Sequence, residues 1–501
     1  MEHRNQKDFI SGLERLFNPK SIALVGASTG FGKWGQLISS NIIAGGYQGK
    51  IFLVNPGKKE MFGLPVFQHI GDIQDPVDLT FIITPAKTVP SVLMQCGDQG
   101  VKGAVIITSG FSETGQDGKA LEKEVVRIGL EKGIHIIGPN TMGIIAPYAN
   151  LFATGSHARP RPGSVAFVSQ SGNLGNQLTH WAEQQGIGIS LFVGSGNEAM
   201  ITCPDYLEYL EQYPHTRIIM LYLESVGLGE HFMEVATRVN RQKPVIVLKG
   251  GRTEAGRSAA ASHTGSMSGE DAIFRGACRQ AGILNARVPS ELLNLSAGFS
   301  CLPLPRGKRV GIVTLGGGWG VVTADACNER GLVVPPIPDH IVEAIGRHLP
   351  PFWSKGNPVD LVGTRDLDAP VVAVEELVKW DGIDAVMVLG VVGRDEFVHQ
   401  LIDSSRRADP EISQEFLDQI KTLSRHFEDS FIAKMVEFME IYEKPIIGVS
   451  LARTDRGTVR PVPGRRYSGI FYQTPETGVN VLARMVEYAK LPFGAAFSKE
   501  P

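Results

Sequence analysis

A single histidine, His263, stands in a stretch of small residues and is the side chain best placed for covalent chemistry. The stretch covers residues 250–266 and follows the apolar run 244–248, which predicts a buried parallel strand with its carboxyl end facing a ligand. Positive charge suited to phosphate comes from Lys249, Arg252 and Arg257. Two interpretations fit: a loop histidine that becomes phosphorylated, or a glycine-rich hinge whose histidine caps a helix.

Two glycine-containing strand ends suit an anion beside such a histidine. The strand predicted over 164–169 runs into the start of a helix, where free backbone amides and the helix dipole can face a phosphate. The strand predicted over 189–193 ends in a glycine loop whose N–H groups can converge on an oxyanion. The candidate phosphate-binding residues are Ser171, Gly172, Gly196 and Asn197. Taken alone, each loop can also be an ordinary structural turn. The presence of both loops together with His263 favours phosphate binding.

A third strand, predicted over 218–223, ends in the carboxylate of Glu224. A carboxylate bonded to one imidazole nitrogen fixes the tautomer, leaves the other nitrogen nucleophilic and stabilises the cation formed on phosphorylation. Glu224 suits that role beside His263, and it also fits as an acid at a helix N-terminus.

The composition limits the class of protein. The 501 residues predict about three domains, at about 100 to 200 residues each. A formal net charge of -3 without a basic block argues against nucleic acid as a partner. Five cysteines without CxxC spacing predict neither a zinc site nor a disulfide framework. The charged start, and apolar runs well short of the roughly 20 residues of a membrane span, predict a cytoplasmic protein with no membrane partner.

The first part of the chain has a strand-helix-strand pattern over residues 21–57 and predicts a Rossmann-like unit. Residues 30–35 match G-x-G-x-x-G, but they begin four residues beyond Gly26, where a dinucleotide turn should start. The second strand ends at Asn55 instead of the acid that holds an NAD ribose, and two lysines beginning at Lys58 follow it. The lysines suit NADP or coenzyme A, each with an extra phosphate, or are solvated surface residues.

Four motifs then follow one another along this part of the chain. They are Val-Gly-Ala-Ser at 25–28, Val-Asn-Pro-Gly-Lys at 54–58, Ile-Thr-Ser-Gly-Phe at 107–111 and Gly-Pro-Asn-Thr-Met-Gly at 138–143. In this order they resemble the CoA-binding domain of the succinyl-CoA synthetase α subunit and of the ADP-forming (NDP-forming) acyl-CoA synthetases. The resemblance implies contacts to coenzyme A from Gly26, Ser28, Gly32, Lys58, Pro85, Ile107, Thr108 and Asn140.

The resemblance continues through the strand ends described above. In chain order, Ser-Gln-Ser-Gly, Gly-Ser-Gly-Asn, Tyr-Leu-Glu and Ser-His-Thr-Gly-Ser are similar to the same synthetases. This similarity implies a phosphohistidine at His263, a supporting carboxylate at Glu224, and phosphate-binding amides at Ser171, Gly172, Gly196 and Asn197.

The implied fold is α/β, with a Rossmann-like CoA-binding domain followed by two flavodoxin-like parallel-sheet domains. Proline-containing links predict domains at residues 1–158, 159–303 and 304–501. The last range begins with a strand and a glycine turn at 310–320 that resemble the CoA-ligase domain. Residues 394–443 depart from the family pattern; their charged, helical stretch over 409–441 is interpreted as an insertion for subunit contact.

The resemblance implies the α-type subunit of an ADP-forming acyl-CoA synthetase. Its substrate is an acyl-CoA or carboxylic acid, its cofactors are coenzyme A and ADP or ATP, and no metal site of its own is expected. No P-loop is present and the chain leaves no room for an ATP-grasp module, so the nucleotide and Mg are expected on a separate ATP-grasp β-type subunit in a hetero- or homo-oligomer.

Two rival functions are weighed against this one. A non-catalytic CoA-binding or sensing subunit would keep the first domain but would not need His263 together with Glu224. An NADP-dependent oxidoreductase would explain the Rossmann-like start, but it leaves the second and third domains without a role. The acyl group, the direction of the reaction, the preference for ADP or GDP and the stoichiometry of subunits stay open.

Overall fold

A computed structural model describes residues 6–226, 229–264, 270–364, 366–450 and 456–494 of the chain. The side chains of 6–8, 260–264 and 395–396 lie outside the described part. The chain divides into two compact units, residues 1–293 and 294–501. The first unit holds two sheets and the second holds one, and each is built largely of parallel strands.

The first sheet has seven strands in the order β3-β4-β2-β1-β5-β6-β7. They are β1 (Ser21–Val25), β2 (Lys50–Val54), β3 (Glu60–Met61), β4 (Leu64–Phe67), β5 (Leu79–Ile82), β6 (Gly103–Ile106) and β7 (His135–Ile137). The helices in this part of the chain are α1 (Gln6–Phe17), α2 (Trp34–Ala44), α3 (Val89–Asp98) and α4 (Gln116–Lys132), with short turns η1 (Ile70–Asp72), η2 (Ala86–Thr88) and η3 (Ser112–Thr114). Apart from the antiparallel β3, this is the 3-2-1-4-5-6 order of a Rossmann sheet, whose ligand crevice lies between β1 and β5.

The second sheet has the order β14-β13-β12-β10-β11-β8-β9. Its strands are β8 (Gly143–Ala146), β9 (Leu151–Thr154), β10 (Pro162–Ser169), β11 (Ile189–Gly194), β12 (Ile218–Leu223), β13 (Val245–Lys249) and β14 (Leu284–Ala286). The connecting helices are η4 (Pro147–Ala149), α5 (Gly172–Gln184), α6 (Cys203–Gln212), α7 (Gly229–Asn240), α8 (Glu254–Thr264), α9 (Asp271–Gln280) and α10 (Pro289–Cys301). Its five parallel strands follow the flavodoxin order 2-1-3-4-5, which places the crevice between β10 and β12.

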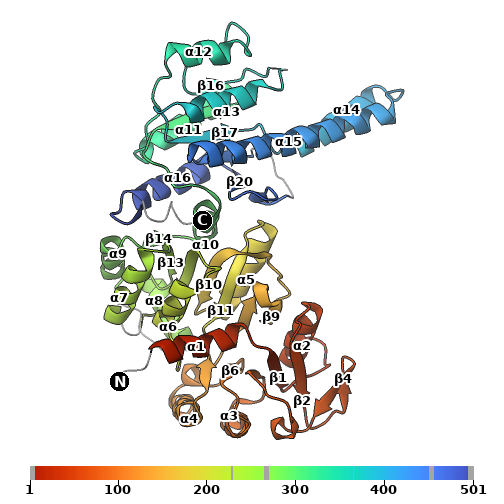
Figure 1. Ribbon diagram of the computed structural model, residues 1–501, viewed down its shortest axis with the longest axis vertical. Helices are drawn as coiled ribbons and strands as arrows, with labels where there is room; N and C mark the ends of the chain where they lie inside the picture. Colours follow the sequence, from red (N-terminus) through yellow and green to blue (C-terminus); the bar gives the residue numbers. More distant parts are fainter. Residues whose placement is uncertain (1–5, 227–228, 265–269, 365, 451–455, 495–501) are drawn as a thin grey trace. The chain divides into compact units, whose positions relative to one another are not determined.

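An antiparallel hairpin links the two sheets of the first unit. β8 and β9 lie within the range 1–158 assigned above to the first domain, yet β8 pairs with β11 at the edge of the second sheet. One apolar cluster of buried side chains runs through both sheets, from Leu24 in β1 to Leu221 in β12. Helix α1 contacts both β6 of the first sheet and α6, which it lies next to in Figure 1, and Tyr209 of α6 donates a hydrogen bond to Glu14 of α1 (2.6 Å). The two sheets therefore form one body, which fixes the geometry between them.

The second unit holds the third sheet, in the order β16-β15-β17-β18-β20-β19. Its strands are β15 (Val310–Thr314), β16 (Val359–Asp360), β17 (Ala385–Leu389), β18 (Ile446–Val449), β19 (Val459–Pro461) and β20 (Ser468–Tyr472). Its helices are α11 (Gly317–Glu329), α12 (Asp339–Gly346), α13 (Ala369–Lys379), α14 (Asp395–Ala408), α15 (Gln414–Tyr442) and α16 (Pro475–Ala489). The predicted architecture of one Rossmann-like and two flavodoxin-like sheets is confirmed.

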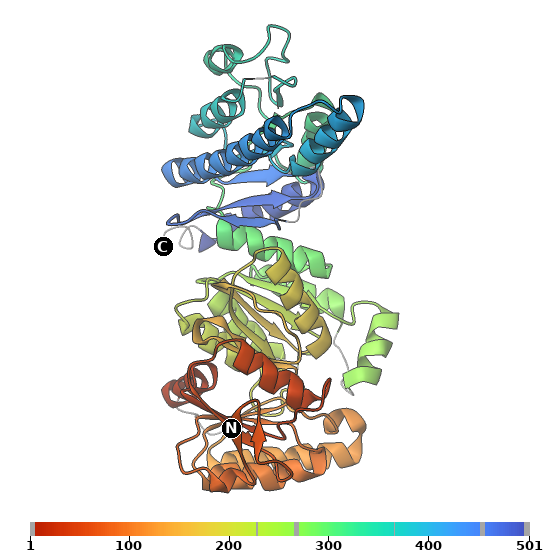
Figure 2. The same ribbon diagram turned by 90° about the vertical axis from the view of Figure 1, so that its right-hand side faces the viewer.

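The charged segment 394–443 forms two helices, α14 and α15, that pack on each other. The carboxyl-terminal half of α15 buries Phe431, Met435 and Met439 and contacts the sheet at β18 and β20 (Figure 2). The amino-terminal half projects beyond the sheet with α14 (Figure 1). Half of the predicted insertion is therefore part of the core of the second unit. Among the helices described, none combines the length and the apolar character needed to cross a membrane.

Candidate active site

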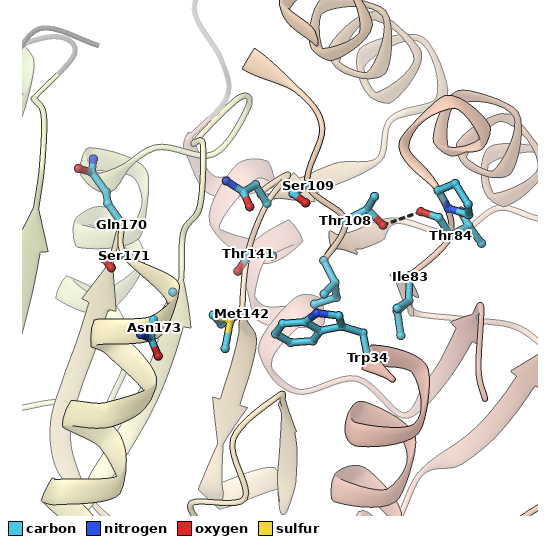
Figure 3. A pocket seen from close by; sticks show the side chains of 14 residues that line it. Trp34, Ile83, Thr84, Thr108, Ser109, Thr141, Met142, Gln170, Ser171 and Asn173 are labelled. Carbon is cyan, nitrogen blue, oxygen red and sulfur yellow. Dashed lines mark hydrogen bonds between the residues drawn. The ribbon is translucent and has the colours of Figure 1, made fainter. Parts of the chain in front are cut away.

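A cavity of about 450 Å³ opens where the ends of the first sheet meet the start of α5. Figure 3 shows Trp34, Thr84 and Thr108 on one side of it, Ser171 and Asn173 on the other, and Thr141 and Met142 between them. Six residues predicted from the sequence to bind coenzyme A or phosphate line this one cavity: Pro85, Ile107, Thr108, Asn140, Ser171 and Gly172. The CoA side and the phosphate side of the predicted site are thus continuous.

Backbone geometry explains why the turn after β1 needs glycine. Gly26 has φ +96°, and a Cβ there would lie 2.9 Å from the carbonyl of Ile83 at the end of β5. Gly35, at the start of α2, sits so close to the Gly26 carbonyl oxygen that a Cβ would collide with it. The absence of side chains at these positions brings α2 against the turn, and α2 in turn carries Trp34 into the cavity wall.

Hydrogen bonds join the loops that line the cavity. The Thr108 hydroxyl donates to the carbonyl of Thr84 (2.6 Å), and the Asn140 amide donates to the carbonyl of Thr108 (2.9 Å). Asn140 has a left-handed backbone, with φ +59°, and its side chain donates to the Asn197 side chain (3.2 Å). The predicted CoA-binding loops therefore hold one another in place.

Four predicted CoA-binding residues do not line the cavity: Gly26, Ser28, Gly32 and Lys58. The Ser28 hydroxyl accepts a hydrogen bond from the amide of Gly30 (3.0 Å), and Lys58 is exposed in the loop after β2. Because β1 and β2 are parallel neighbours, both loops leave the same edge of the sheet. Their roles in binding CoA stay predictions.

The start of α5 has the geometry that suits the predicted binding of phosphate. Ser171 caps the helix in an extended conformation, and no side-chain capping bond is made. The first amides of a helix have no acceptor within the helix, so those of Gly172 and Asn173 are directed past its end. A Cβ on Gly172 would collide with Met142.

The second predicted phosphate loop is organised differently. Gly196 has φ +61°, and a Cβ there would collide with the carbonyl oxygen of Pro139. The Asn197 amide donates to the same carbonyl (3.0 Å), and its side chain donates to Glu113 (2.7 Å) and Glu122 (2.9 Å). Neither Gly196 nor Asn197 lines the cavity. With these hydrogen bonds Asn197 joins the two sheets. Its contact with phosphate stays a prediction, which this geometry does not favour.

Glu113 is a titratable member of that junction. Burial alone would raise its pKa, but hydrogen bonds from the Asn197 side chain and the Gly110 amide hold the pKa of Glu113 below its ordinary value. The Glu113 carboxylate is therefore held in its charged form by donors from both sheets.

Comparisons with known proteins identify the family. Family models match in three places: a CoA binding domain at residues 20–147, a succinyl-CoA ligase like flavodoxin domain at 162–299 and a ligase-CoA domain at 310–393. The α subunit of the ADP-forming acetate–CoA ligase I of Pyrococcus furiosus is 42% identical over 383 residues, which are 75% of this chain and 82% of that subunit. The chain belongs to the ADP-forming acyl-CoA ligases. The resemblance stated from the sequence motifs is confirmed.

Two further relatives support the assignment of the ligase. The α subunit of the P. furiosus ligase II is 40% identical over 381 residues, or 76% of this chain and 82% of that one. The dinucleotide forming acetyl-coenzyme A synthetase 1 of Ca. Korarchaeum cryptofilum, solved with phosphate and ADP, matches with a TM-score of 0.79 at 32% identity. That match covers 97% of this chain and 98% of the other, so the whole ligase chain has the fold of that synthetase.

Glu224 of the ligase lies at the end of β12 and is only 8% exposed. Its amide donates to the side chain of Gln170 (2.7 Å), and the Tyr222 hydroxyl lies 3.5 Å from its carboxylate. Burial and the nearby carboxylate raise the pKa of Tyr222 to about 12, so the phenol stays protonated as a donor. The Gly250 amide donates to the carbonyl of Leu223 (2.8 Å), which brings the loop after β13 against Glu224.

The backbone of His263 lies in helix α8, although residues 250–266 were expected to form a loop. Alanines at 259–261 favour a helix, and Glu254 adds an acid in its first turn. The His263 side chain lies outside the described residues. Helix α8 contacts η3, which follows the cavity loop of Thr108. The helix that carries the histidine therefore contacts the segment that follows a loop of the cavity.

Glu198 is not among the site residues predicted from the sequence, and the structure singles it out. Its backbone is left-handed, with φ +54°, and its carboxylate accepts hydrogen bonds from the Ser195 hydroxyl (2.7 Å) and the Cys203 amide (3.2 Å). Burial raises the pKa of Glu198 to about 7. No spacing pattern could have identified Glu198, because its neighbours come from several loops.

Proposed function

We propose that this chain is the α-type subunit that converts acyl-CoA, phosphate and ADP into carboxylic acid, CoA and ATP, in a reversible reaction. The observation that carries the proposal is the single cavity that joins four predicted CoA-binding residues to the amino-terminal end of α5. A thioester and a phosphate have to meet for this reaction, and a shared cavity removes the entropy cost of bringing them together. The family assignment supports the same activity.

The chemistry proceeds in two steps on this chain. A phosphate oxygen attacks the thioester carbonyl, the carbon–sulfur bond breaks, and CoA leaves with an acyl phosphate remaining. A ring nitrogen of His263 then attacks phosphorus, the bond to the acyl oxygen breaks, and the carboxylate leaves. Phosphoryl transfer depends on positioning and on stabilising the equatorial oxygens, which suits the amides at Gly172 and Asn173.

Glu224 supports the histidine in this proposal. A buried carboxylate that accepts a proton-bearing imidazole nitrogen keeps the other nitrogen nucleophilic and stabilises the cation that forms. The hydrogen bond from the Gly250 amide to the Leu223 carbonyl places the loop that precedes α8 beside the turn of Glu224. Gly250 and Gly251, the latter with φ +65°, stand directly before α8 and are suited to a hinge.

The phosphoryl group passes to ADP on an ATP-grasp partner, where Mg would accompany the nucleotide. The Pyrococcus relatives are named as α subunits, and this chain covers 82% of ligase I. By contrast, it covers only 54% of the ADP-forming acetate–CoA ligase I of Archaeoglobus fulgidus, at 36% identity. The relatives that are named as α subunits support placing the ATP-grasp module on a second subunit.

The acyl group is proposed to be small, with acetyl-CoA as the first substrate to test. The names of the Pyrococcus and Korarchaeum relatives specify acetate or acetyl-CoA. Trp34 and Met142 narrow the cavity with bulky side chains near the helix amides.

The experiment measures thiol release and ATP formation. The purified chain, with and without the ATP-grasp subunit of the Pyrococcus ligase, receives phosphate, ADP and each of a panel of acyl-CoAs. Phosphate-dependent release of CoA, with ATP made only when the partner is present, supports the proposal. CoA binding without phosphate-dependent thiol release from any acyl-CoA, even with the partner, would leave a CoA-binding subunit as the better account.

A further inference from the structure

In the second sheet, the side chain of Gln170 crosses the crevice between β10 and β12. Gln170 directly follows β10, and Glu224 directly follows β12, on the two strands between which a flavodoxin-like sheet opens its crevice. The Gln170 amide continues the ladder with a hydrogen bond to the Tyr222 carbonyl (3.1 Å). Because β10 and β12 are neighbouring strands, the side chain of Gln170 lies at the crevice and reaches the turn at Glu224.

The side-chain amide of Gln170 fixes that turn at three points. Its oxygen accepts from the amides of Glu224 (2.7 Å) and Ser225 (3.1 Å), and its nitrogen donates to the carbonyl of Ser225 (3.1 Å). The reverse orientation would place an NH₂ group against two backbone N–H donors, so the network admits one orientation. Three bonds to two consecutive residues define the direction in which Glu224 leaves the strand.

Gln170 also belongs to two other parts of the site. It lines the cavity that holds the predicted CoA-binding residues, and Figure 3 shows it above Ser171 at the start of α5. Its side chain also lies close to the carboxylate of Glu198, which comes from the loop after β11, and partly offsets the rise in the pKa of that carboxylate. One amide thus contacts the cavity, the turn of Glu224 and the loop of Glu198.

We propose that Gln170 is a positioning residue for phosphoryl transfer: from the wall of the acyl-CoA cavity it sets the turn that presents Glu224 to the histidine helix. The inference rests on the proposed function, because it takes Glu224 as the support of His263. Gln170 needs no contact with the transferred group. Its removal should slow phosphorylation of the histidine far more than it weakens binding of acyl-CoA.

The test compares Gln170→Ala and Gln170→Glu with a control glutamine variant, Gln184→Ala, on the exposed carboxyl-terminal turn of α5, the helix that begins two residues after Gln170. The full chain is given acetyl-CoA and phosphate, or the ATP-grasp partner and ATP, and the rate of phosphoryl adduct formation is followed by intact mass. Gln170→Ala is expected to slow the adduct on the order of 10- to 100-fold by both routes, with KM for acetyl-CoA changed less than about 3-fold. Gln184→Ala should match the wild type.

The pH dependence of the Gln170→Glu variant distinguishes a positioning role from a purely structural one. The glutamate keeps an oxygen for the two backbone amides but places a second carboxylate against Glu198, so the pair favours holding one proton. The titratable groups near Glu198 are Asp205, Cys203 and Tyr206, and those near the turn that Gln170 binds are Glu224 and Tyr222. The rate of Gln170→Glu relative to wild type should therefore rise several-fold as the pH falls from about 8 to about 6.

The possible results distinguish a failure of the proposed function from a failure of the positioning role of Gln170. A wild-type chain that forms no adduct by either route would overturn the proposed function. If the wild type forms the adduct and Gln170→Ala forms it at an unchanged rate, the positioning role alone is overturned. The same holds if Gln170→Ala raises KM for acetyl-CoA by as large a factor as it lowers the rate. If Gln170→Ala fails to fold by circular dichroism, a Gln170→Glu rate with the wild-type pH dependence would still refute it.

Discussion

Two glycine loops of the second sheet look alike in sequence and differ in what their amides do. After β10, Ser171 and Gly172 open a helix, and the first amides of that helix border the cavity. After β11, Gly196 and Asn197 turn into the neighbouring backbone, and the Asn197 amide is bonded to Pro139. Glycine allows both arrangements, but the first directs helix N–H groups towards the cavity, whereas in the second the Asn197 N–H is bonded to the Pro139 carbonyl.

The difference arises from what packs against each loop. The loop after β11 lies under residues 138–140, and the Ala199 amide donates to the carbonyl of Gly138 (3.1 Å). Its polar atoms hold the Rossmann sheet to the flavodoxin sheet through Glu113 and Glu122. The loop after β10 meets Met142 instead, an apolar side chain that accepts no hydrogen bond from the helix. We therefore expect mutations in one loop to affect stability and mutations in the other to affect binding.

Gly196→Ala should give the largest effect on stability. The new methyl combines a left-handed backbone with a clash against the Pro139 carbonyl, and together these cost about 3 to 5 kcal/mol. Urea unfolding of the first unit measures it. Gly46→Ala is the control, because Gly46 has a similar φ of +78° but open space around it, and should lose only about 1 kcal/mol. Equal losses in the two variants would show that the loop is not packed as described.

Asn197→Asp should have the next largest effect, because it places a third carboxylate beside Glu113 and Glu122. We expect it to lower the free energy of unfolding by about 2 to 3 kcal/mol near pH 8. Like charges raise the pKa of the group, so protonation should recover part of the loss near pH 5. Asn197→Ala lacks the extra charge and should show no such recovery. Parallel unfolding curves at both pH values make the comparison, and a pH-independent loss in Asn197→Asp would contradict it.

Glu198→Gln tests the raised pKa in the same loop. The folded pKa of about 7 exceeds the unfolded value of about 4.3, so the folded state binds the proton more tightly. The stability of the wild type should therefore fall as the pH rises through this window and stay level above it. Glu198→Gln should remove this slope and be relatively more stable at pH 8, by about 1 to 3 kcal/mol. Thermal unfolding across pH 4 to 8 measures the slope, and an unchanged slope would refute the assignment.

Gly172→Ala should leave folding nearly intact and weaken ligand binding. The methyl pushes Met142 into the cavity and crowds the helix amides, which predicts a KM for acyl-CoA or phosphate raised about 10-fold, or about 1.4 kcal/mol. Steady-state kinetics measure the change. Adding Met142→Ala should restore part of the affinity if the clash is the cause. A loss of stability without a change in KM would assign the two loops the same role.

Much of the fold follows from local pattern. Valine and isoleucine runs ending in glycine or small residues predict buried parallel strands, and such strands place their ends at one edge, as Thr108 and Ser171 are placed. Helix α15 (Gln414–Tyr442) agrees with the helix expected over 409–441. The helical state of residues 254–264 was missed because glycines and serines were given more weight than the three alanines.

The remaining features depend on long-range contacts. The pairing of β8 with β11 joins segments from two predicted domains, and no local signal specifies it. Gln170 stands between two serines after a buried strand, which marks a strand end but does not identify its partners. Those partners, Glu198 and Ser225, come from two other loops and meet Gln170 only in the folded sheet. Local sequence therefore marks the strand ends at which candidate residues stand, but it does not identify the long-range contacts that position them.

The central claim, that His263 carries the phosphoryl group, is tested most directly by peptide mapping. The chain is mixed with acetyl-CoA and ³²P-phosphate, quenched in alkali, digested, and the labelled peptide is sequenced by mass spectrometry, with His263→Ala alongside. We expect an acid-labile, alkali-stable label on the peptide that contains His263, and none in the variant. A label on another residue, or an equal label in His263→Ala, would contradict the account.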